Sequence, residues 1–136
     1  MAKNKTRKSN AAAQGLPKAM PVVPVMVLWH PEAVVDFDEQ VSDKQTRKRV
    51  HTSVDVLVRS GGKAPFPVQS AIGGSDGLRE LRCGGGRVTW RPIFSQIDGT
   101  ELFVIWAFGP EAQVNQSGFD EAVRRARQRR DAVTGG

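Results

Sequence analysis

The stretch from Gly77 to Phe108 constrains the fold most, because it has the pattern of an antiparallel sheet. Asp98-Gly99 stands between two runs of β-forming residues and predicts a hairpin with a two-residue turn, since both residue types tolerate the positive φ that such turns need. Cys83 to Gly86 supplies the other reversal. The run from Leu102 to Phe108 is apolar on both faces, which predicts an interior strand of the sheet.

Side chains in the strand that begins near residue 87 alternate between two faces of the predicted sheet. One face is apolar and fits the core, whereas the other carries arginines. The apolar set is Val88, Trp90 and Phe94, and the polar set is Arg87, Thr89 and Arg91. Because guanidinium groups bind phosphate well, this alternation predicts an electropositive sheet face.

Helices are predicted on both sides of this block. Pro31 starts one helix, and Ser42 opens a second with a capping-box pattern. Gly61-Gly62 ends the second helix, and Ser117 is the expected N-cap of a C-terminal helix.

A first strand is expected over residues 22–29, and residues 63–76 are expected to form an irregular loop. The resulting order is one strand, two helices, a loop, three strands and a helix. This order predicts an α+β domain with a mostly antiparallel sheet.

The formal net charge of +6 is distributed unevenly. Residues 1–20 carry five basic and no acidic side chains, and residues 119–136 carry five arginines against three acids, so residues 21–118 sum to −1. We therefore expect a basic disordered tail over residues 1–20 and a single, almost neutral domain over residues 21–134.

The remaining composition narrows the class of protein. Cys83 is the single cysteine and has no partner for an intramolecular disulfide, which favours a reducing cytoplasm. The apolar run over residues 21–29 is too short to span a membrane. No metal-ligand cluster, P-loop or dinucleotide-binding glycine pattern occurs in the sequence, so neither a metal nor a cofactor is expected.

The block GLRELRCGGGRVTWRPIF, followed by Asp98-Gly99 and an apolar strand, resembles the RelE/ParE toxin superfamily, particularly its phage-derived RelE-like branch. The shared features are an L-x-E-L-R strand, a glycine-containing turn, an aromatic-arginine pair and a hairpin. The resemblance covers roughly residues 25–133. It implies a RelE/ParE-like fold with a four-stranded, mostly antiparallel sheet, two N-terminal helices and a C-terminal helix.

The resemblance also implies a function. It suggests a toxin of a type II toxin-antitoxin system, or a phage protein, that binds RNA at the ribosome and has an antitoxin protein as its partner. RelE-like endoribonucleases cut mRNA without a metal, by helping the ribose 2′-hydroxyl attack the adjacent phosphorus. By position, the candidate catalytic residues are Arg82 and Arg91, and the candidate nucleic-acid-binding residues are Arg79, Arg87, Arg124 and Arg125.

The chain departs from catalytically active relatives in ways that leave its status as an enzyme open. It has Gly109-Pro110-Glu111 where those relatives carry basic residues, and it contains no tyrosine. Arginine is a poor general base because its pKa lies above 12. The remaining candidates for proton transfer are Glu80, Glu111, His30 and His51, and we expect His30 to be a cap or turn residue and His51 a surface or packing residue.

Two other functions remain open. One is a non-catalytic relative that binds a host protein, such as gyrase, or nucleic acid. The other is an unrelated basic α+β binding domain, such as a phage host-takeover protein.

The candidate residues also have simpler structural explanations. Arg79 and Arg82 flank Glu80 and fit an exposed, salt-bridged strand face. The arginines of the C-terminal helix fit a solvated helix face, and the three tryptophans, Trp29, Trp90 and Trp106, fit the core.

Overall fold

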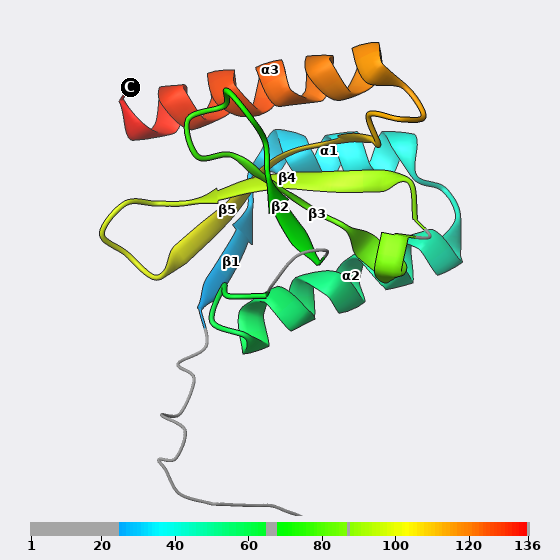
Figure 1. The fold of residues 1–136 in the computed structure, drawn as a ribbon, viewed down its shortest axis with the longest axis horizontal. Coiled ribbons are helices and arrows are strands. Elements are labelled where there is room, and N and C mark those ends of the chain that lie inside the picture. The colour runs from blue at the N-terminus through cyan, green and yellow to red at the C-terminus, as the bar shows by residue number, and fades with distance from the viewer. Residues whose placement is uncertain (1–24, 65–67, 87, 136) are drawn as a thin grey trace, which may run out of the picture.

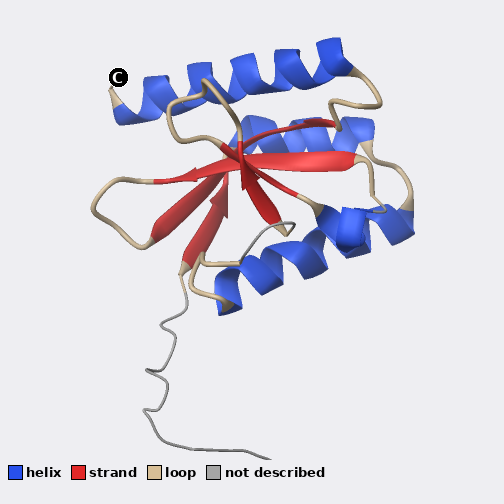
Figure 2. Ribbon diagram, viewed as in Figure 1, coloured by secondary structure: helices blue, strands red, loops and turns tan. Residues whose placement is uncertain are grey.

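A five-stranded sheet with helices on both faces forms the domain (Figure 1, Figure 2). The computed structural model describes residues 25–64, 68–86 and 88–135, so the predicted tail over residues 1–20 and the candidate Arg87 lie outside the described residues. The elements in chain order are β1 (Met26–Trp29), α1 (Pro31–Gln40), α2 (Lys44–Arg59), β2 (Gln69–Ala71), β3 (Arg79–Leu81), a 3-10 turn (Cys83–Gly86), β4 (Trp90–Gln96), β5 (Leu102–Pro110) and α3 (Gln116–Thr134).

The strand order is β1-β5-β4-β3-β2, with β1 parallel to β5 and the other pairs antiparallel. The predicted α+β class and mostly antiparallel sheet are confirmed, and β5 is an interior strand. The sheet has five strands instead of four, because Gln69–Ala71 lies in the predicted loop and pairs with β3. Three residues are too few to show a period-two pattern in the sequence.

The helix starts were predicted to within two residues. His30 is the N-cap of α1 and accepts a hydrogen bond at Nδ1 from the Glu32 amide at 3.1 Å, which confirms its role as a cap. The cap of α2 is Asp43 instead of Ser42, and the cap of α3 is Asn115 instead of Ser117. In both helices the side-chain oxygen of the N-cap residue, a carboxylate in Asp43 and an amide in Asn115, accepts a hydrogen bond from a backbone amide of the first turn, as is common at N-caps.

The predicted hairpin between β4 and β5 is confirmed, but the prediction of a two-residue turn is wrong. Residues 97–101 join the strands, and only Gly99 has a positive φ there, at 74°, whereas a type I′ turn would require one at Asp98 as well. The Thr100 hydroxyl donates to the Ile97 carbonyl and accepts from the Leu102 amide. These two hydrogen bonds stabilise the longer connection.

The two faces of the sheet have separate cores. We call the face covered by α1 and α2 the hairpin face, after these two consecutive helices and not after the β4–β5 hairpin. The opposite face, covered by α3, is the α3 face. Trp90 and Phe94 belong to the hairpin face, whereas Ile93 belongs to the α3 face, so the predicted alternation along β4 is confirmed. The α3 face is closed by Phe119, Ala122 and Ala126.

A β-bulge in β5 changes which face the end of the strand presents. Phe94 pairs with Ile105, but Ile93 pairs with Ala107, so Trp106 is one extra residue in the strand. Trp106 and Ala107 both lie on the α3 face. Beyond the bulge Gly109 also faces α3, where an added Cβ would lie 2.4 Å from the Ala122 Cβ, so only glycine fits.

Candidate functional site

Arg91 lies in β4 directly opposite Gly109 and therefore on the α3 face of the sheet. Only 1% of its side chain is exposed, and it forms ion pairs with two glutamates. Its Nε lies 3.3 Å from Glu80 Oε1, and its Nη2 donates to Glu111 Oε2. We call these three residues the Arg91 cluster.

The sheet register assembles this cluster. Glu80 pairs with Ile93 across β3 and β4, which puts its side chain on the α3 face one step from Arg91. Glu111 follows β5, and it reaches the same face because the bulge at Trp106 shifts the alternation by one residue. Both glutamates were candidates for proton transfer, and the structure brings them to the same guanidinium.

The cluster is not an electropositive surface. Two carboxylates and one guanidinium sum to −1 when all are ionised. The α3 face is also covered by a helix, so the predicted electropositive face is wrong at Arg91. The guanidinium has a buried Nη1 without a hydrogen-bond partner in the described part of the chain. The catalytic assignment of Arg91 stays a prediction.

The other candidate arginines make intramolecular contacts. Arg79 lies on the hairpin face and donates to Gln69 Oε1 at 2.8 Å. The main-chain amide of half-buried Arg82 donates to the Val68 carbonyl at 2.8 Å, and Arg82 has further interactions within the chain. Arg124 pairs with Glu121, and Arg125 contacts Glu121 and Asp36. Their roles in nucleic-acid binding stay predictions.

The arginines near the C-terminal end of α3 anchor this helix. Arg129 reaches α1, where its Nη1 donates to Asp36 at 2.8 Å, and the same nitrogen donates to the Trp106 carbonyl at 2.9 Å. On the other side, Arg130 donates to the Asp76 carbonyl at 2.8 Å. The predicted solvated face is therefore wrong for Arg129 and Arg130, whose side chains are only 10% and 14% exposed.

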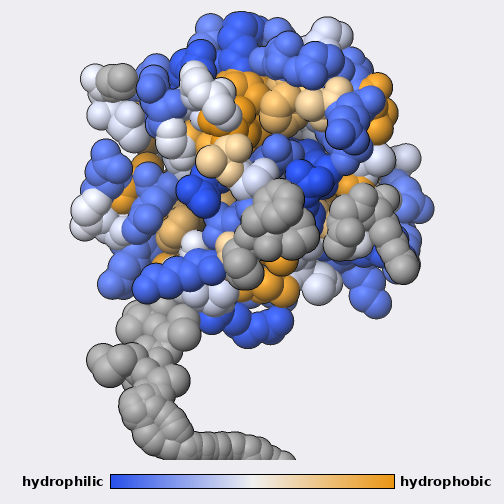
Figure 3. All heavy atoms as spheres, in the orientation of Figure 1, coloured by the Kyte–Doolittle hydropathy of each residue, from blue (hydrophilic) through white to orange (hydrophobic). Residues whose placement is uncertain are grey.

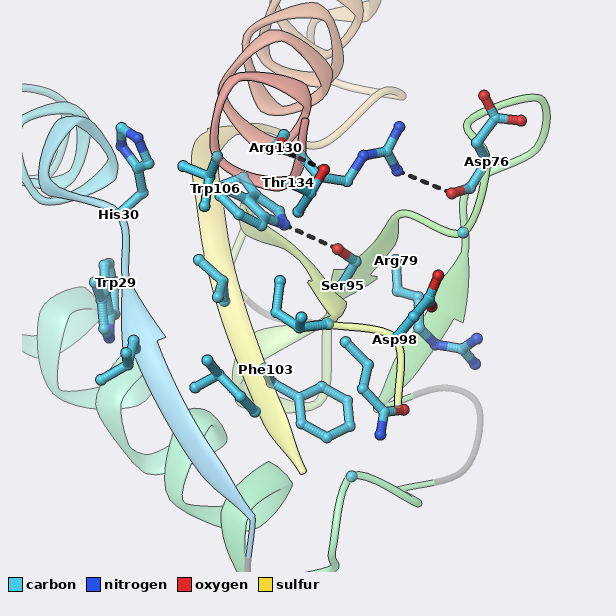
Figure 4. A pocket seen from close by; sticks show the side chains of 18 of the residues that line it. Trp29, His30, Asp76, Arg79, Ser95, Asp98, Phe103, Trp106, Arg130 and Thr134 are labelled. Atoms are coloured by element: carbon cyan, nitrogen blue, oxygen red, sulfur yellow. Dashed lines mark hydrogen bonds between the residues drawn. The ribbon is translucent and has the colours of Figure 1, made fainter. Parts of the chain in front are cut away.

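An open cleft of about 1330 Å³ lies beside the C-terminal end of α3 (Figure 4). Trp106 and Arg130 border it. Among the described candidates from the sequence, Arg79 and the proton-transfer candidate His30 line it. The Arg91 cluster does not line it. In Figure 3 hydrophilic side chains cover α3 at the top of the view, and hydrophobic ones gather just below.

The tryptophans pack in or against the core, and His51 is a surface residue beside Trp29, as predicted. Trp106 is 1% exposed, and its Nε1 donates to Ser95 Oγ at 2.8 Å. Trp29 and Trp90 pack against the core of the hairpin face. His51 is exposed, with its ring centroid 5.9 Å from that of Trp29.

Cys83 is expected to be chemically inert in the folded protein. Burial raises the pKa of its thiol to about 11, although a hydrogen bond with Ser53 and the charge of Arg91 act in the opposite direction. Because the thiolate is the reactive form, iodoacetamide at about pH 8 should modify Cys83 only in denaturant. Mass spectrometry of native and unfolded samples measures this, and rapid labelling of the native protein would contradict it.

The same shift predicts a pH dependence of stability. The folded-state pKa lies above the ordinary value of 9.0, so the unfolded chain releases this proton first. The contribution of Cys83 to stability is therefore fully present below pH 9 and declines as the pH rises toward about 11.

The described residues contain no group of three or more histidine, cysteine, aspartate or glutamate side chains that could hold a metal ion. None of the described helices is both long and apolar enough to cross a membrane.

A solved structure of the E. coli toxin RelE, in the free state and with two arginines replaced by alanine, is similar to this chain. The similarity covers 75% of this chain and 97% of the RelE chain, with a TM-score of 0.50 and 15% sequence identity. The chain has a RelE-like fold. No protein-family model and no curated protein sequence matches the chain. The similarity to RelE is therefore a similarity of fold.

Sequence reasoning found Arg91 and both glutamates of the cluster but not their association. The only sequence signal was the presence of an arginine in one predicted strand, with acidic residues in or directly after the neighbouring strands. The pairing of Arg91 with Glu111 depends on the bulge at Trp106, and the alternation of apolar and polar residues along the sequence did not indicate this bulge.

Proposed function

We propose that the chain is a toxin-like protein that binds RNA at the ribosome and does not cut it. The observation that carries this proposal is the burial of Arg91 between Glu80 and Glu111. Cleavage at a phosphate develops negative charge, which requires positive groups aimed at the reacting oxygens. In this arrangement, a buried guanidinium that is paired with two carboxylates cannot supply positive charge to the reacting oxygens.

Several features support a binding role. The RelE-like fold agrees with a toxin, and the sequence motifs favour the phage-derived RelE-like branch. The basic residues 1–20 would add affinity for RNA that is independent of its sequence and sensitive to salt. By analogy with other toxins of this superfamily, we expect an antitoxin protein as partner and a cytoplasmic location.

A second candidate function is an mRNA-cleaving toxin, which the two carboxylates beside Arg91 favour. In that case an ionised glutamate would take the proton of the ribose 2′-hydroxyl as its oxygen bonds to phosphorus. The other glutamate, protonated, would give its proton to the departing 5′-oxygen. Arg82 and Arg91 would then stabilise the charge on the phosphate.

Inducible expression in a bacterium, with growth and mRNA 5′ ends followed together, tests the two functions. We expect growth arrest without new 5′ ends inside coding regions, and crosslinking of the chain to ribosomal or messenger RNA. The control is Arg82→Ala, which should weaken crosslinking if Arg82 contacts RNA.

New 5′ ends that disappear in Arg91→Ala and in Glu80→Gln would favour the cleaving toxin. Arrest without RNA crosslinks would favour a protein target, such as gyrase. Absence of arrest would contradict a toxin-like function.

A further inference from the structure

We infer that Glu80 and Glu111 block a phosphate-binding site at Arg91. This inference rests on the proposed function, because it names the residues that keep the guanidinium from RNA. Its evidence is the burial, charge and contacts of the Arg91 cluster.

The carboxylates of the Arg91 cluster are more exposed to solvent than the guanidinium. The side chains of Glu80 and Glu111 are 16% and 20% exposed, whereas that of Arg91 is 1% exposed. Solvent therefore reaches the carboxylates of the cluster rather than the guanidinium, and their negative charge repels a phosphate.

The guanidinium keeps unused binding capacity. Its Nη1 is buried without a hydrogen-bond partner among the described residues, and its Nε makes an ion pair with Glu80 but no hydrogen bond. A guanidinium has five donors, and a phosphate can accept two of them side by side. The site therefore has hydrogen-bond donors for an anion, but its net negative charge opposes anion binding.

Removal of carboxylate charge should make the net charge of the Arg91 cluster favourable for binding an anion. Glu111→Gln changes the sum of the cluster from −1 to 0, and the double substitution Glu80→Gln with Glu111→Gln changes it to +1. A buried guanidinium that loses its counter-charges is destabilised, so either a turn toward solvent or an anion as a new partner becomes favourable.

The experiment measures binding of a single-stranded RNA oligonucleotide to the full chain at several salt concentrations. We expect Glu111→Gln to bind roughly tenfold more tightly than wild type at low salt, and the double variant more tightly still. The slope of log affinity against log salt should steepen by about 0.7, the value for one added phosphate contact with a single strand.

Glu101→Gln is the matched control, because it makes the same change in charge at an exposed residue of the β4–β5 hairpin, away from Arg91. Arg91→Met in the Glu111→Gln background should remove the gain. Circular dichroism and thermal melting of each variant establish that it is folded, and Glu80→Gln alone provides a second single variant if Glu111→Gln unfolds.

Three results would overturn the inference: an equal gain in Glu101→Gln, a gain that survives Arg91→Met, or no gain in a folded variant. Unfolding of both single glutamine variants would also overturn it, because the glutamates would then be structural supports. Cutting of mRNA by the wild-type chain would contradict the proposed function and leave this binding result unaffected.

Discussion

Replacement of Arg129 by methionine is expected to lower the free energy of unfolding by about 3–5 kcal/mol. This arginine connects α3 to Asp36 of α1 and to the Trp106 carbonyl of β5. Asp36 is 9% exposed, so the substitution leaves its carboxylate largely buried and without its main partner. Urea denaturation followed by circular dichroism measures the change.

Arg124→Met is the matched control, because it removes an arginine from the same helix whose partner, Glu121, is exposed. Such surface pairs contribute little to stability, and we expect the control to unfold like wild type. Equal effects of the two substitutions would show that Arg129 does not anchor the helix.

Trp106→Ala is expected to lower the free energy of unfolding by about 3–5 kcal/mol, the usual cost of removing a large buried aromatic side chain. The side chain is 1% exposed and belongs to the core of the α3 face. Trp106→Phe keeps most of this packing and loses the hydrogen bond to Ser95, so its cost should be about 1 kcal/mol.

The comparison of these two variants by urea denaturation separates packing from hydrogen bonding at the bulge. A larger loss in Trp106→Phe than in Trp106→Ala would contradict a packing role for this residue.

The order of the elements could be predicted because local chemistry determines it. Pro31, the glycines after α2 and the apolar pattern of β5 act within a few residues of sequence, and each of these predictions was confirmed. Even the wrong caps lay within two residues of the right ones, because several cap-forming side chains stand side by side at each helix start.

The environment of the arginines could not be predicted in the same way. The acceptors of Arg129 lie in α1 and β5, 93 and 23 residues away in the chain, and only the packed fold brings them to α3. The pairing of Arg91 with Glu111 spans 20 residues and also depends on the bulge. A charged side chain in a sequence carries no sign of whether its partner is water or a distant carboxylate.

The extra residue at Trp106 also bears on how this chain is aligned with its structural relatives. In a relative whose last strand lacks the extra residue, an ungapped alignment fixed on the first half of β5 would match residues of opposite sheet faces beyond Trp106. Gly109-Pro110-Glu111 would then be compared with residues of the wrong face. From such a relative, functional residues near the end of this strand should be transferred only after a one-residue gap is placed at Trp106.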